Sequence, residues 1–114
     1  MLYKVFLDTN IYDGANYSFH NALFLTLRNK AASDELELHI NSVVEDEVKA
    51  HISRDVKRAA KELSQAISNR SLAGFRKLPP FQDKLSIPKP NEWVQTALDE
   101  FQYFLTDCRV KKSR

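Results

Sequence analysis

The 114-residue sequence has a single cysteine, no long apolar run and a net charge of only +2. With Cys108 alone, no disulfide can form within the chain, which is typical of proteins in a reducing compartment. No segment approaches the ~20 apolar residues that span a membrane. Asp8 interrupts the N-terminal apolar run too early for a signal peptide. We therefore expect a cytoplasmic protein without a membrane partner.

Composition and length indicate one globular domain. Hydrophobic residues make up 43% of the chain and charged residues 28%, as in ordinary globular proteins. A chain of this length buries roughly 65% of the surface that its unfolded form exposes, so a hydrophobic core can form. The small net charge indicates no particular partner. Residues 1–114 are therefore predicted to form a single domain or the N-terminal part of one.

The first 41 residues predict two parallel strands joined by a helix. The unbroken apolar run at 5–7 is typical of a strand covered on both faces, as in parallel sheets. Residues 11–18 resemble a loop, and the apolar spacing after them predicts a helix over 19–32. Alternation of apolar and polar residues predicts a second strand at 36–41. A strand, a helix and a strand favour a right-handed parallel crossover.

A long helix is expected after the second strand. Ser42 and Glu45 match a capping box, and a continuous apolar stripe predicts a helix over 43–70, so that 1–72 is a β-α-β-α unit. Its opposite face is rich in charge, which is typical of solvated surface. Lys49 and Arg54 on this helix are also candidates for contact with a nucleic-acid backbone, because phosphate contacts need only positive charge.

The last part of the chain is predicted to be a loop and a final helix. Prolines interrupt residues 73–91, with a short helical turn expected at Ala73–Leu78. Asn91 is the predicted N-cap of a helix over 92–111 that ends in a basic tail. The sequence shows only two convincing strands, which is few for an α/β domain.

Two acidic residues are expected at the same edge of the sheet. Asp8 follows the first strand, and Glu47 lies about one turn into the helix after the second strand. In a parallel pair both carboxyl ends meet at one edge, which is where ligands bind in α/β sheets. Two carboxylates close together favour a cation, and Mg²⁺ or Mn²⁺ accepts such ligands. The alternatives are a strand-end cap for Asp8 and a dipole-stabilising role for Glu47.

These residues resemble the PIN-domain ribonucleases. The segment Val5-Phe6-Leu7-Asp8-Thr9-Asn10 is similar to the opening of that family, whose first strand ends in an Asp-x-Asn motif. The segment 42–52 is similar to the one that carries the family's second acidic residue. The resemblance implies a Rossmannoid fold, Asp8 and Glu47 as catalytic metal ligands, and Asn10 as a supporting catalytic residue. It also implies a metal-dependent endoribonuclease that acts on single-stranded RNA.

The chain departs from the family after residue 90. Active PIN domains carry a third and often a fourth acidic residue on later segments, whereas Asp99, Glu100 and Asp107 are all expected within one helix. The acidic site is therefore predicted to be incomplete here, either because more sequence follows or because the domain is reduced. The alternative function is an inactive PIN-like module that binds RNA or a protein such as an antitoxin, and a homodimer is one of the partner predictions. A haloacid-dehalogenase-like phosphotransfer domain is a third reading, but Asn10 stands where that family needs a second Asp.

Overall fold

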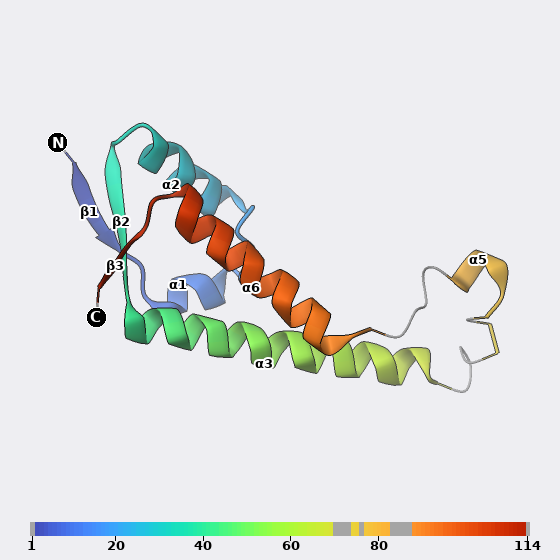
Figure 1. The fold of residues 1–114 in the computed structure, drawn as a ribbon. Helices are drawn as coiled ribbons and strands as arrows, with labels where there is room; N and C mark the ends of the chain where they lie inside the picture. The colour runs from blue at the N-terminus through green and yellow to red at the C-terminus, as the bar shows by residue number, and fades with distance from the viewer. Residues whose placement is uncertain (1, 70–73, 76, 83–87, 114) are drawn as a thin grey trace.

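The computed structural model describes residues 2–69, 74–75, 77–82 and 88–113, and it is elongated, with extents of 61 × 26 × 20 Å (Figure 1). The elements in chain order are β1 (Tyr3–Phe6), α1 (Thr9–Gly14), α2 (Ala22–Ala32), β2 (Leu36–Asn41), α3 (Ser42–Ile67), α5 (Pro79–Gln82), α6 (Pro90–Asp107) and β3 (Lys111–Ser113). The described strands form one parallel sheet in the order β1-β2-β3. This confirms the predicted α/β fold with a long helix after the second strand.

The β-α-β unit forms as predicted, and β2 has the predicted boundaries. Tyr3 pairs with Leu36 and Phe6 with His39 in parallel register. Leu38 and Ile40 are buried on the helix side of the sheet. The alternating apolar residues of β2 therefore determine which face of the sheet carries the core.

The expectation that β1 is covered on both faces is wrong. Only Val5 of this strand is partly buried, whereas Tyr3 and Phe6 are 64% and 65% exposed. In the described sheet β1 is an end strand. Phe6 lies on the face opposite the helices and is exposed to solvent. The ring of Phe6 instead stacks on His39 across the strand pair, with centroids 4.7 Å apart.

The predicted loop after the first strand is in fact partly helical. Asp8 is the N-cap of α1, and the helix ends at Gly14. Tyr12 of α1 is 1% exposed and lies in the core, so tertiary packing outweighs the turn-forming composition of this segment. The following helix α2 starts at Ala22, because Asn21 caps it by accepting a bond from the Phe24 N–H at 3.0 Å.

Both long helices begin differently from the prediction. The N-cap of α3 is Asn41, whose side chain accepts a hydrogen bond from the Val44 N–H, and Ser42 is already helical. Helix α6 begins at Pro90 after Lys89 without a side-chain cap. Proline suits this first position because its missing N–H would have no helical partner there.

The basic end of the chain forms a third strand, which corrects the predicted helix over 92–111. Helix α6 ends at Asp107, and the following segment turns at Arg109 (φ 51°) to form β3 beside β2. Lys112 Nζ lies 3.3 Å from Glu45 of α3, which also pairs with Lys49 at 3.4 Å. The Lys112–Glu45 ion pair connects β3 to the start of α3.

The predicted turn at Ala73–Leu78 lies partly outside the described residues. Helix α3 ends at Ile67 rather than at residue 70. Helix α5 lies at the end of the molecule far from the sheet (Figure 1). Within the described part of the chain, no helix combines the length and apolar character needed to cross a membrane.

An aromatic cluster forms the centre of the core. Its members come from α1, α2, α6 and the segment before α2: Tyr12, Phe19, Phe24, Phe101 and Phe104. Their ring centroids lie 5.1–6.3 Å apart in stacked, tilted and edge-on pairs, which is the favoured range for aromatic contacts. The cluster holds α1 and α2 against α6.

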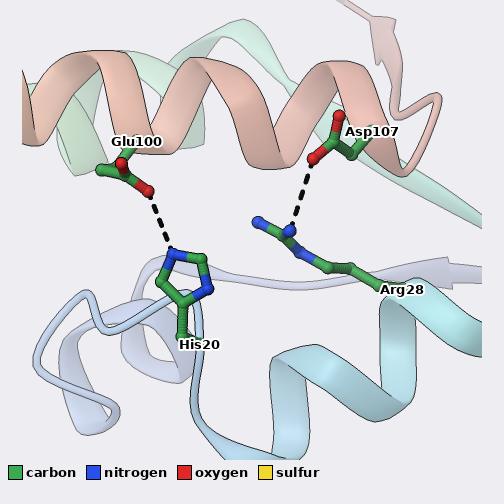
Figure 2. A network of polar contacts seen from close by, with 4 residues as sticks. All are labelled: His20, Arg28, Glu100 and Asp107. Carbon is green, nitrogen blue, oxygen red and sulfur yellow. Dashed lines mark hydrogen bonds and ion pairs between the residues drawn. The ribbon is translucent and has the colours of Figure 1, made fainter.

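Two polar pairs lie at the edge of this contact (Figure 2). His20 Nε2 lies 3.1 Å from Glu100, and Arg28 Nη1 lies 3.3 Å from Asp107. The guanidinium of Arg28 also lies 5.8 Å from the centre of the Phe104 ring. The His20–Glu100 pair is exposed and Arg28 is partly buried, and such pairs add little stability individually. They lie on the side of α6 that faces α2 (Figure 2).

The thiol of Cys108 is expected to be unreactive in the folded protein. Cys108 is 3% exposed, and burial raises the pKa of its thiol to about 11. Because the thiolate is the reactive form, we expect slow labelling by a thiol reagent at mildly alkaline pH and fast labelling in denaturant. Labelling at equal rates in both conditions would contradict this prediction.

Candidate metal and nucleic-acid site

Asp8 lies just beyond the carboxyl end of β1. Its Oδ1 accepts a hydrogen bond from the Asn10 backbone N–H at 2.6 Å, which caps α1. The side chain is exposed, and within the described part of the chain Oδ2 has no hydrogen bond. Asp8 therefore caps the start of α1, which is not the strand-end cap given as its alternative role, and its Oδ2 remains available to a ligand.

Glu47 is connected directly to the segment that follows β1. Thr9 Oγ1 donates a hydrogen bond to Glu47 Oε2 at 2.6 Å, across 38 positions of sequence. Helix α1 packs on α3 at this point. The structure thus places Glu47 against the residue next to Asp8, at the carboxyl edge of the sheet.

The other residues predicted for the site have different surroundings. The contact of Asn10 with Asp8 is through its backbone N–H, and its side chain is exposed. Lys49 pairs with Glu45, and Arg54 Nε lies 3.0 Å from Asp55. Helix geometry separates the two cations: Arg54 lies seven residues after Glu47 on the same face, whereas Lys49 does not share that face.

Asp8 and Glu47 fit a divalent ion that takes two carboxylate ligands from the protein and keeps bound water. Among the described residues, no three His, Cys, Asp or Glu side chains gather into a metal site. However, Mg²⁺ keeps several waters and is commonly held by one or two carboxylates together with substrate phosphates. Asp8 and Glu47 supply this number of carboxylates, and the Thr9 hydroxyl lies beside them.

A second polar cluster next to Glu47 was not predicted. The Tyr17 hydroxyl lies 3.1 Å from Asp13 Oδ1 and 3.0 Å from His51 Nδ1. Because an ionised carboxylate only accepts, Tyr17 donates to Asp13 and accepts from the Nδ1–H of His51. In the neutral ring, Nε2 of His51 is then an acceptor. Asp13 therefore orients His51 through Tyr17.

The sequence contains a signal for this cluster in the spacing of its residues. Asp13 and Tyr17 are four residues apart, and His51 follows Glu47 by one helical turn on the same face of α3. The backbone at Asn16 and Tyr17 is left-handed, with φ of 52° and 55°. This conformation is uncommon for residues other than glycine and is often found at functional sites.

Tyr17 is expected to ionise at unusually high pH. Burial, and then the hydrogen bond to Asp13, raise its pKa from 10.0 to about 12. Since the folded state holds this proton more tightly than the unfolded state, the contribution of Tyr17 to stability is complete below pH 10 and is lost as the pH rises toward 12. Tyrosine Cζ NMR shifts should show this titration. In Asp13→Asn the midpoint should fall, and an unchanged midpoint would contradict the proposed hydrogen bond.

The parallel sheet and the helices packed on it define an α/β domain, with acidic residues after each of its first two strands. A comparison with protein families gives a match to the PIN domain over residues 5–109, and the chain belongs to this family. The family has a nuclease-type fold, generally uses divalent metal ions and is associated with RNA. Searches of curated proteins and of solved structures gave no significant match.

Proposed function

We propose that the protein is a metal-dependent endoribonuclease acting on single-stranded RNA. The observation that supports this most directly is the Thr9–Glu47 hydrogen bond, which holds the Asp8 and Glu47 segments together at the carboxyl edge of the sheet. This is where ligands bind in open α/β sheets. Membership of the PIN-domain family supports the same class of reaction.

In the proposed site, Asp8 and Glu47 hold Mg²⁺ or Mn²⁺. Such an ion, when bound, activates water and stabilises negative charge on a phosphodiester. The Thr9 hydroxyl fixes the orientation of Glu47, and the Asn10 N–H fixes that of Asp8. Asn10 thus supports the site through its backbone. Arg54 attracts the RNA backbone along the face of α3 that carries Glu47. Lys49 is the weaker contact because it lies on a different face of α3 from Glu47.

Metal binding and metal-dependent cleavage test this proposal together. We expect calorimetry to detect Mn²⁺ binding to the chain, and an unstructured RNA to be cleaved in Mg²⁺ or Mn²⁺ but not in EDTA. Binding should weaken when either acidic residue is replaced by its amide, because each removes a charged ligand. Cleavage that persists in EDTA would contradict the proposal.

A second candidate is a non-catalytic PIN-like module. It is favoured by the absence of a third acidic ligand among the described residues. Such a module would bind RNA, an antitoxin or a second copy of the chain in the cytoplasm. The exposed ring of Phe6, on the face of the sheet opposite the helices, offers an apolar contact for a protein partner. RNA binding without any metal-dependent cleavage would favour this candidate.

A further inference from the structure

A surface cavity of about 370 Å³ lies between α3, α6 and the segment after α1. Helix α6 returns toward the sheet at an angle to α3, and α1 lies within that angle (Figure 1). The cavity is lined by Asn16, Tyr17, Ile52, Asp55, Val56, Ala59, Ala97 and Glu100. The small side chains of Ala59 and Ala97 leave space between the helices. Its volume is in the range of small-ligand sites.

The lining of the cavity favours a flat apolar ligand with N–H donors. Ile52 and Val56 form apolar walls, and Tyr17 contributes an aromatic ring. Asp55 and Glu100 are 39% and 45% exposed, so both carboxylates remain accessible. Their partners in the protein are Arg54 and His20 respectively, and a carboxylate has further lone pairs available. A nucleobase has this combination of an apolar face and a polar edge.

The position of the cavity relates it to the proposed metal site. Asp55 follows Glu47 by eight residues on α3, which is about 12 Å along the helix. His51 lies between them and is hydrogen bonded to Tyr17, which lines the cavity. Arg54 and Arg58 are exposed beside Asp55 and provide positive charge for a nucleic-acid backbone. A short single-stranded segment can therefore reach from Glu47 to the cavity.

We propose that this cavity binds one base of the RNA substrate, two helical turns of α3 from Glu47, and that it selects guanine. Guanine presents N1–H and N2–H side by side, which matches the two oxygens of a carboxylate, and such paired bonds are strong and specific. Uracil presents a single N–H between two carbonyl oxygens, which a carboxylate repels. Asp55 is the residue that reads the base, Glu100 provides a second acceptor, and the Tyr17 ring is available for stacking.

The inference rests on the proposed function only for its RNA substrate, and its test requires neither metal nor cleavage. Amide NMR spectra of the full chain are recorded in EDTA with added GMP, AMP, CMP or UMP. We expect GMP to bind most tightly and UMP most weakly, with shifts at Tyr17, Asp55 and Ala97. Asp55→Asn should weaken GMP binding at least tenfold, because it removes the charged acceptor.

Two further variants keep the result interpretable. Glu62→Gln removes the same charge from an exposed position of α3 outside the cavity, and it should leave GMP binding unchanged. Ala59→Leu fills the cavity and should weaken the binding of all four nucleotides, while well-dispersed spectra show that the fold is intact.

Equal binding of UMP and GMP, or unchanged GMP binding in Asp55→Asn, would overturn the inference. Tighter binding of N-acetyl-arginine amide than of GMP would also overturn it and would indicate a protein-partner site. Selective GMP binding by a chain that does not cleave RNA would support guanine binding in the cavity and contradict only the nuclease proposal.

Discussion

Replacing Asp8 with asparagine is expected to lower the rate of RNA cleavage by roughly 100-fold or more, because it removes a charged metal ligand. Each 1.36 kcal/mol of transition-state stabilisation that is lost lowers the rate about tenfold. Asparagine is as good an N-cap as aspartate, so the bond to the Asn10 N–H can persist. Asp8→Asn therefore tests the charge separately from the cap. Single-turnover kinetics at saturating Mn²⁺ measure the cleavage rate, and calorimetry measures the affinity for Mn²⁺.

Asp46→Asn is the matched control for this experiment. Asp46 precedes Glu47 on α3 and is exposed, so this variant removes the same charge near the site without touching either proposed ligand. We expect cleavage within about twofold of the parent chain, since exposed substitutions change little. If Asp8→Asn cleaves as fast as Asp46→Asn, Asp8 is a cap and not a metal ligand.

Replacing Phe104 with alanine is expected to destabilise the fold by about 3–5 kcal/mol. Phe104 is fully buried, and its ring centroid lies 5.1 Å from that of Phe24 and 5.2 Å from that of Phe19. Removing the ring leaves a cavity and eliminates the aromatic contacts that pack α6 against α2. Urea unfolding followed by circular dichroism gives the change in free energy.

The neighbouring residue provides the control. Tyr103 is the next residue on α6 and is 59% exposed. Tyr103→Ala should change the free energy of unfolding by no more than about 0.5 kcal/mol. Phe104→Leu keeps part of the buried volume and should lie between the two variants. Equal losses for Phe104→Ala and Tyr103→Ala would show that the aromatic cluster does not determine stability.

The parts of the fold that were predicted correctly have strong local patterns. The alternation in β2 and the long apolar stripe of α3 depend on residues close in sequence, and their positions held within a few residues. The segment after β1 and the start of α3 meet at the carboxyl edge of the sheet, as the geometry of parallel strands predicts. The connection through Thr9 was not predicted, because its partner lies on a different element.

The errors occur where tertiary contacts decide the structure. Lys111–Ser113 has no apolar pattern, and it forms a strand because β2 offers an open edge and Glu45 attracts Lys112. Helix α1 contains turn-forming residues, but burying Tyr12 stabilises it. The contact of Tyr17 with His51 depends on how α1 packs on α3, so neither residue was assigned to the candidate site.

The position of β1 at the end of the described sheet has a consequence for the exchange of its amide hydrogens. In that sheet β1 is paired with β2 alone, so half of its N–H and C=O groups point away from the ladder. Strands held on one side open at lower free energy than strands held on both. Since Asp8 directly follows β1, local opening of this strand would displace the first acidic residue while Glu47 stays fixed on α3. The Thr9–Glu47 hydrogen bond is the side-chain contact that such an opening has to break, so exchange of the β1 amides and separation of the two proposed metal ligands are expected to be coupled.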